Sequence, residues 1–405
     1  MKNPFITLVA FLSFCSITAQ ATTALPSVNE IQYIKKTFSL LDEWEVNYIY
    51  NNETANAATD KKYLNDVVFD SDEVSVWTPY SKSRILYEYT PANDKSALVL
   101  QTWDGTSTNW NNTYRQQTNY TADGNLQAVV LKTWNSDENN WFAIYQDQYF
   151  YTQTGNIETE ASQMWNIATD TWNNIERKLY NYNAKGYLTS IVTQTADAKM
   201  ANVWHNKTQS VYNYDKNGNE WLIIEQIWNA EHNTWNNSQR GVIDYTPQQD
   251  VETAVVQNWD KTNWDNLTRQ LKSYDNEGNL LTTAQQTWNE QYQMWQSLTL
   301  EKREIDANNR IVQTTQLLWD NENQSWVNAN QQTYIYDENY LKAIVSHYWN
   351  EIDRIWEIDS KSVFTYLVPF SVTPSSNKAT PNNSEIIIRS TPKQTSLLKS
   401  TPKQK

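Results

Sequence analysis

The 405-residue chain has little of what most catalytic sites and disulfide frameworks need. It contains one cysteine, three histidines and seven glycines. A single cysteine cannot form an internal disulfide or a multi-cysteine zinc site. The sequence has no Walker loop, dinucleotide fingerprint, nucleophile elbow or HExxH motif. We therefore expect a protein that is not an enzyme and that binds no cofactor.

The three histidines do not suggest a metal site. His205, His232 and His347 lie far apart in the sequence and do not share a position in any repeating pattern. A metal site would need ligands that converge from distant segments. We expect these histidines to be surface residues and predict no metal ion.

The amino end has the form of a secretory signal peptide. Lys2 precedes an apolar run from Phe5 to Phe14, and an A-x-A cleavage pattern ends at Ala21. We expect cleavage after Ala21 and a secreted or cell-surface protein. Lipidation of Cys15 is the less favoured alternative, because the bulky Phe14 precedes it. No later run approaches the roughly 20 apolar residues of a membrane helix, so we expect no membrane insertion.

Charge and composition divide the chain into four parts. The net charge is -14, yet the residues from Leu367 onward carry six Lys or Arg and one acid. An acidic body repels nucleic acid, so we expect no nucleic-acid partner. The predicted parts are a signal peptide at 1–21, an N-terminal segment with a degenerate repeat at 22–64, tandem repeats at 65–366 and a flexible basic tail at 367–405.

Aromatic residues are present in excess and follow a regular period. The chain has 20 Trp and 25 Tyr, and 19 of the Trp fall on one repeating lattice. Pairs of Trp stand seven residues apart, and the second Trp recurs every 29 to 33 residues from Trp77 to Trp356. Trp44 marks a degenerate copy. Such a period indicates an array of small structural repeats.

Each repeat reads as two strands joined by a turn. A Y-x-Y stretch is followed by D/N-x-x-G-N, in which five of the seven glycines occupy one position. Glycine and asparagine tolerate positive φ, so this position predicts the left-handed residue of a hairpin turn, with Asn93, Asn309 and Asn339 in place of glycine in other copies. We expect Asp215, Asp275 and Asp337 to bond to turn amides rather than to calcium.

The alternation of residues favours strands. In the stretch from Trp172 to Tyr182 a period of two places Trp172, Asn174, Glu176, Lys178, Tyr180 and Tyr182 on one face. The polar residues between Trp134 and Trp141 then form a reverse turn, and the two indoles face each other across the hairpin.

These features predict an all-β fold. We expect an antiparallel meander of about 20 to 22 strands, built from 31-residue hairpin repeats and curled into a superhelical single sheet or an open barrel. A β-propeller with two periods per blade is the alternative. An outer-membrane barrel is disfavoured because both strand faces carry polar residues.

The repeat resembles two known groups. The "YDxxGN" turn before an aliphatic strand is loosely similar to the Tyr-Asp repeats of Rhs-type bacterial proteins. The W-x6-W-x-N spacing looks more like the tandem Trp/Tyr repeats of proteins secreted by Bacteroidetes-type bacteria. The resemblance covers about residues 65–366 and implies a secreted protein. The chain departs from Rhs-type proteins, whose repeats are shorter and richer in glycine.

The aromatic rows suggest a binding function. Indole faces beside Asn, Gln and Asp side chains suit a sugar ring, and an array adds multivalency. We predict a non-catalytic binding or adhesion module for a polysaccharide or a surface protein, with candidate binding residues Trp134, Trp141, Trp165, Trp172, Trp228 and Trp235. The alternative is a structural scaffold whose rings form its core and whose variable face binds partners. A glycan-active enzyme is a remote third hypothesis.

Overall fold

The computed structural model describes residue 35 and residues 63–70, 83–90, 94–104, 107, 109–200, 202–338 and 340–367. Several predictions lie outside these residues: the signal peptide, Cys15, Trp44, Trp77, Asn93, Asn339 and the tail after residue 367. Among the described residues, no helix has the length and hydrophobicity to cross a bilayer.

The described chain consists of strands joined by short turns. In chain order they are β1 (Tyr63–Asp70), β2 (Ser83–Tyr89), β3 (Lys95–Asp104), β4 (Asn109–Tyr120), β5 (Leu126–Asn135), β6 (Asn140–Tyr151), β7 (Ile157–Asn166), β8 (Thr171–Tyr182), β9 (Leu188–Ala196), β10 (Trp204–Tyr214), β11 (Glu220–Asn229), β12 (Thr234–Tyr245), β13 (Val251–Trp259), β14 (Trp264–Tyr274), β15 (Leu280–Asn289), β16 (Met294–Ile305), β17 (Ile311–Asp320), β18 (Ser325–Asp337), β19 (Tyr340–Asn350) and β20 (Ile355–Leu367).

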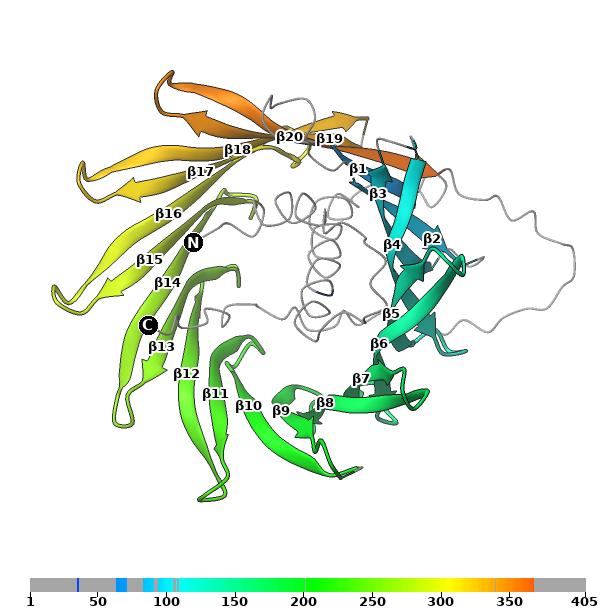
Figure 1. The fold of residues 1–405 in the computed structure, drawn as a ribbon. Helices are drawn as coiled ribbons and strands as arrows, with labels where there is room; N and C mark the ends of the chain where they lie inside the picture. The colour runs from blue at the N-terminus through cyan, green and yellow to red at the C-terminus, as the bar shows by residue number, and fades with distance from the viewer. Residues whose placement is uncertain are drawn as a thin grey trace, which may run out of the picture.

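All twenty strands belong to one antiparallel sheet. Each strand pairs with the next along the chain, and β20 also pairs with β1, from Tyr63 opposite Leu367 to Asp70 opposite Lys361. The sheet therefore curls round until its first and last strands meet (Figure 1). The predicted all-β curled sheet is confirmed. The alternative of a β-propeller is wrong, because the strands form one sheet rather than separate blades.

The turns between repeats have the predicted chemistry. Gly186 has φ of +82° and donates its amide to the Asn183 carbonyl at 2.9 Å. The Asn183 side chain accepts the amide of Lys185 at 2.9 Å and that of Tyr187 at 3.1 Å. Asn309, at φ of +60°, takes the glycine position in a later copy, as expected.

The predicted role of the turn aspartates is confirmed at Asp215 and Asp275. Asp215 accepts the amides of Asn217 and Asn219, each at 2.8 Å. Asp275 accepts two amides in the same way, at 2.9 and 2.8 Å. The role of Asp337, the last residue of β18, stays a prediction, because residue 339 of its turn lies outside the described residues.

Each Trp hairpin contains a β-bulge, and this bulge changes which residues of the strand share a face. Gln163 pairs with Asn174, but Ser162, the residue before Gln163, pairs with Glu176, so Ile175 is an extra residue. Neighbouring residues of a strand point to opposite faces, and therefore Asn174 and Glu176 do too. The prediction that Trp172 and Asn174 share a face with Glu176, Lys178, Tyr180 and Tyr182 is wrong. The bulge moves the latter set to the opposite face.

The sheet consequently has two different faces. The indole face carries the Trp pairs, and the other face, here called the core face, carries the main hydrophobic cluster. Its buried residues come from both ends of the sheet: Ile85, Tyr87, Leu98, Leu100, Leu131, Ile144, Tyr145, Tyr334, Leu341, Ile344 and Phe364. A smaller cluster of Ile223, Ile243 and Ala254 lies on the same face farther round.

Tyrosine hydroxyls form a hydrogen bond at the open end of most Trp hairpins. Tyr182, at the end of β8, donates to the carbonyl of Ile157 at the start of β7, at 2.8 Å. Eight described tyrosines make the equivalent bond to a residue 23 to 26 positions earlier: Tyr120, Tyr151, Tyr182, Tyr214, Tyr245, Tyr274, Tyr336 and Tyr366. Seven of these eight hairpins also carry an indole pair at the other end; the exception is β9–β10, where Trp204 pairs with Ala196.

Candidate functional site

Paired indoles stand at the turn end of the Trp hairpins and form what we call the indole rim. Eight pairs are described, with ring centroids 4.9 to 5.2 Å apart: Trp103–Trp110, Trp134–Trp141, Trp165–Trp172, Trp228–Trp235, Trp259–Trp264, Trp288–Trp295, Trp319–Trp326 and Trp349–Trp356. Seven pairs meet edge to face and one is tilted, which are the favoured geometries of aromatic pairs.

The six predicted binding residues belong to three of these pairs. Trp134 pairs with Trp141 across β5 and β6, and the other two pairs lie in the β7–β8 and β11–β12 hairpins. All six indoles are half-buried. The structure therefore brings them together two by two, in three repeats of one row, rather than into a single pocket.

The turn between the two indoles explains the polar residues found there. The Asn135 side chain accepts the amides of Asp137 at 2.9 Å and Glu138 at 3.3 Å. Asn139 then takes a positive φ of 52° before the chain re-enters the sheet. Equivalent positions in later hairpins also have positive φ, so this conformation is part of the repeat.

Next to the rim, polar side chains cross the indole face in a ladder. Arg84 on β2 donates to Gln101 on β3 at 2.6 Å, and Gln101 donates to Asn112 on β4 at 2.7 Å. The same Arg–Gln–Asn order recurs as Arg177–Gln194–Asn206 and Arg240–Gln257–Asn266. The ladder orients amide groups in register with the Trp pairs.

The arginines of the ladder also cover indoles. The Arg84 guanidinium lies 4.6 Å from the ring centroid of Trp110. Three further stacks are described, Arg177 on Trp204, Arg240 on Trp264 and Arg269 on Trp295, at 4.5 to 4.8 Å. Such stacking suits an indole that serves as a structural element. It occupies ring surface that a ligand would need.

The ladder is interrupted beside Trp134 and Trp141. Lys132 stands where most other repeats have glutamine, and its cross-strand neighbours are Arg115 and Ala143. Arg115 instead forms a two-pronged ion pair with Glu88, at 2.9 and 2.6 Å. Partial burial and the nearby Arg115 lower the pKa of Lys132. Within the described residues Lys132 makes no hydrogen bond or ion pair.

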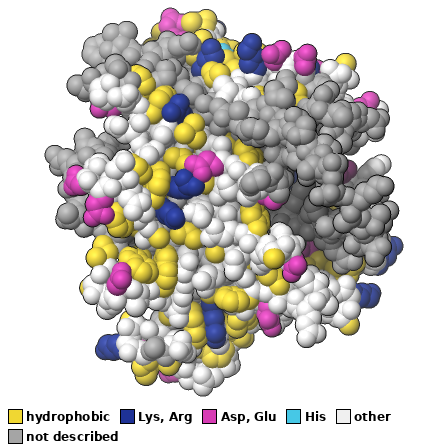
Figure 2. All heavy atoms as spheres, turned by 90° about the vertical axis from the view of Figure 1, so that its right-hand side faces the viewer, with side chains coloured by type: hydrophobic (Ala, Val, Ile, Leu, Met, Phe, Trp, Pro, Cys, Tyr) yellow, Lys and Arg dark blue, Asp and Glu magenta, His cyan; other side chains and the backbone are white. Residues whose placement is uncertain are grey.

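Few charged side chains stand on the coloured part of the surface in Figure 2. It shows hydrophobic patches among uncharged side chains and backbone, with scattered positive and negative charges. A surface of this kind favours ligands that combine apolar faces with hydroxyl groups.

The histidines lie apart. His205 contacts Asp197 at 2.9 Å, His232 contacts the Asn229 side chain at 3.3 Å, and His347 is half-buried on β19. The described residues contain no group of three or more metal-ligating side chains.

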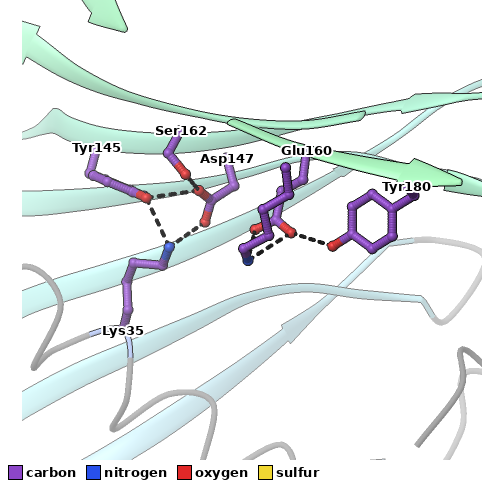
Figure 3. A network of polar contacts seen from close by, with 7 residues as sticks. Lys35, Tyr145, Asp147, Glu160, Ser162 and Tyr180 are labelled. Atoms are coloured by element: carbon purple, nitrogen blue, oxygen red, sulfur yellow. Dashed lines mark hydrogen bonds and ion pairs between the residues drawn. The ribbon is translucent and has the colours of Figure 1, made fainter. Parts of the chain in front are cut away.

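A second polar site lies on the core face of β6, β7 and β8 (Figure 3). Asp147 is only 3% exposed and accepts hydrogen bonds from Tyr145 at 2.8 Å and Ser162 at 2.6 Å. Lys35, far away in sequence, forms an ion pair with the same carboxylate at 2.6 Å.

Beside it, Glu160 anchors a second set of contacts. Lys178 reaches both oxygens of Glu160 at 3.1 Å, and the Tyr180 hydroxyl donates to one of them at 2.9 Å. Burial, reinforced by the charge of Glu160, raises the pKa of Tyr180 and of the neighbouring Tyr149 well above the ordinary value. Asp147 and Glu160 each form an ion pair with a lysine ammonium group. Such pairing is typical of charges that stabilise the fold.

Sequence reasoning missed this second site. Its residues follow the repeat spacing only in part, and the bulge places Lys178 and Tyr180 on a face other than the one predicted. The available signal was the pair of acids Asp147 and Glu160, which stand at positions where most repeats have uncharged residues.

Comparison with known proteins identifies no family for this chain. No protein-family model and no curated protein matches the sequence. Similar solved structures include a DUF3836 family protein from Bacteroides vulgatus, with 17% identity, a TM-score of 0.16 and coverage of 30% of this chain and 90% of that one. A porin-like protein from Bacteroides uniformis has 11% identity and a TM-score of 0.31, with 75% and 96% covered.

A third similar structure is that of TcdB2-TccC3-TEV, with 12% identity and a TM-score of 0.27, covering 69% of this chain and 15% of that one. Likenesses of this degree carry no functional argument. The relation to secreted Trp/Tyr-Asp repeat proteins therefore stays a prediction, and function is argued from the residues themselves.

Proposed function

We propose that this chain is a secreted or cell-surface binding protein without catalytic activity, and that its indole rim binds carbohydrate. The observation that carries the proposal is the row of eight half-buried indole pairs, most of them placed beside amide side chains. Indoles offer an apolar platform for the C–H face of a sugar, and the amides offer donors and acceptors for its hydroxyls.

The spacing of the row supports a polymeric ligand. Neighbouring Trp hairpins are two strands apart, so successive pairs recur at about 9 to 10 Å along the rim. A polysaccharide that follows the rim contacts several pairs at once, and each further contact adds to a weak single-site affinity.

The pair Trp134–Trp141 is the strongest candidate for a platform. Its neighbour Lys132 provides an open donor, and the small Ala143 stands where most other repeats carry an asparagine. The pair Trp288–Trp295 is the opposite case, because Arg269 lies 4.8 Å from the Trp295 ring. The two pairs have similar ring separations, 4.9 and 5.1 Å, so they form a matched comparison.

A purely structural role of the indoles is the second candidate. The edge-to-face packing and the arginine stacks favour it. In that case the rings only clasp the hairpins, and partners bind elsewhere on the sheet.

A titration of soluble oligosaccharides, followed by tryptophan fluorescence, separates the two candidates. The proposal predicts saturable binding that the double variant Trp134→Leu/Trp141→Leu weakens several-fold more than Trp288→Leu/Trp295→Leu does. Circular dichroism would check that both variants keep their strands. Absence of binding across a broad glycan panel, or equal effects of the two variants, would contradict the proposal.

A further inference from the structure

Lys35 occupies a defined ammonium site on the core face of β6 and β7 (Figure 3). Its Nζ donates to the Tyr145 hydroxyl at 2.9 Å and contacts Asp147 Oδ2 at 2.6 Å. The same nitrogen lies 4.3 Å from the centroid of the Tyr145 ring. A carboxylate, a phenol oxygen and an aromatic ring thus surround one ammonium group.

The sheet builds this site without help from Lys35. Tyr145 and Asp147 stand two residues apart on β6, and Ser162 lies directly opposite Asp147 on β7. Tyr145 and Ser162 both donate to Asp147 Oδ1, which leaves Oδ2 directed at the ammonium. Lys35 itself is 110 residues from Tyr145 in sequence.

The charge of Asp147 requires a cation at this place. The carboxylate is almost fully buried, and a buried charge is tolerated only when it is paired. Lys178 on β8 pairs with Glu160 and Lys207 on β10 pairs with Glu176, so both are engaged elsewhere. Among the described residues, Lys35 is the cation that contacts Asp147.

We infer that Tyr145, Asp147 and Ser162 form a binding site for a primary alkylammonium group, and that the side chain of Lys35 is its resident ligand. The Lys35 side chain is 28% exposed, so part of it contacts solvent. The 2.6 Å contact leaves no room for methyl groups between nitrogen and carboxylate. The site therefore accepts n-butylammonium in place of Lys35 and rejects tetramethylammonium.

Chemical rescue of Lys35→Ala tests the inference in the full chain. The substitution lowers the midpoint of thermal unfolding, and n-butylammonium chloride raises it again in a saturable manner, because a ligand that binds only the folded state stabilises it. Tetramethylammonium chloride at equal concentration does not. The double variant Lys35→Ala/Asp147→Asn shows no rescue, and neither does the control Lys207→Ala, whose side chain is 54% exposed.

Equal effects of the two salts, or rescue that persists without the Asp147 carboxylate, would overturn the inference. If Lys35→Ala does not fold, limited acetylation of the unmodified protein gives a second test. Mass spectrometry should show Lys35 modified several-fold more slowly than Lys207, and faster in Asp147→Asn. Modification of Lys35 at the rate of Lys207 would equally contradict the assignment.

Discussion

Replacing Trp228 and Trp235 by leucine, singly and together, measures how much one indole pair holds its hairpin. The rings are 4.9 Å apart at 64°, and both are half-buried. Each Trp→Leu change removes roughly 50 to 80 Å² of buried apolar surface, or about 1 to 2 kcal/mol of unfolding free energy. The contact between the two rings contributes about 0.5 to 1.5 kcal/mol in addition. Each single variant loses this contact, and the double variant loses the same contact once, so the two single costs add up to more than the double cost.

The double-mutant cycle should therefore give a coupling energy of about 0.5 to 1.5 kcal/mol. Urea unfolding followed by circular dichroism at neutral pH provides the four stabilities. A coupling within about 0.3 kcal/mol of zero would refute the account of the indoles as cross-strand clasps.

The arginine stack provides an internal comparison for the same experiment. Arg269 lies 4.8 Å from the Trp295 ring, whereas the arginine–indole stacks described elsewhere do not involve Trp235. Trp295→Leu should therefore cost about 0.5 to 1 kcal/mol more than Trp235→Leu. Equal costs would mean that the guanidinium contributes nothing to the rim.

Three further predictions concern the turns and the open ends of the hairpins. Tyr182→Phe loses a hydrogen bond and should cost about 0.5 to 1.5 kcal/mol in urea unfolding, while Tyr292→Phe, a turn residue 62% exposed, should change little. Gly186→Ala, at φ of +82°, should cost about 1 to 2 kcal/mol, whereas Gly241→Ala, in an open strand position, should be neutral or stabilising. Backbone amides hold the pKa of Asp215 below its usual range, so its contribution to stability is present above about pH 4 and is lost as pH falls. The variant Asp215→Asn should therefore lose less resistance to urea between neutral and acid pH than the unmodified protein does. An unchanged loss would contradict this.

The repeat period of the sequence predicted the β-hairpins of this fold. The seven-residue Trp spacing and the positive-φ position at Gly186 are local signals, since each depends on residues within one hairpin. Because both recur in nearly every copy, the hairpins, their order and the number of strands could be predicted from the sequence.

The features that could not be predicted depend on geometry beyond one hairpin. The extra residue Ile175 in the bulge leaves no mark in composition, yet it reverses the face of every residue after it. The contact of Lys35 with Asp147 spans more than a hundred residues and has no counterpart among the described residues of other repeats. Curling of the sheet until β20 meets β1 follows from accumulated twist, which spacing alone does not specify.

The measurement that most directly tests the binding function is the dependence of affinity on ligand length. For a polysaccharide bound by the intact chain, oligosaccharides of increasing length should bind progressively more tightly until they span several indole pairs of the rim, because each added pair contributes a further weak contact. No binding at any length, or an affinity independent of length, would contradict the claim that the repeated indole pairs act together as a binding surface.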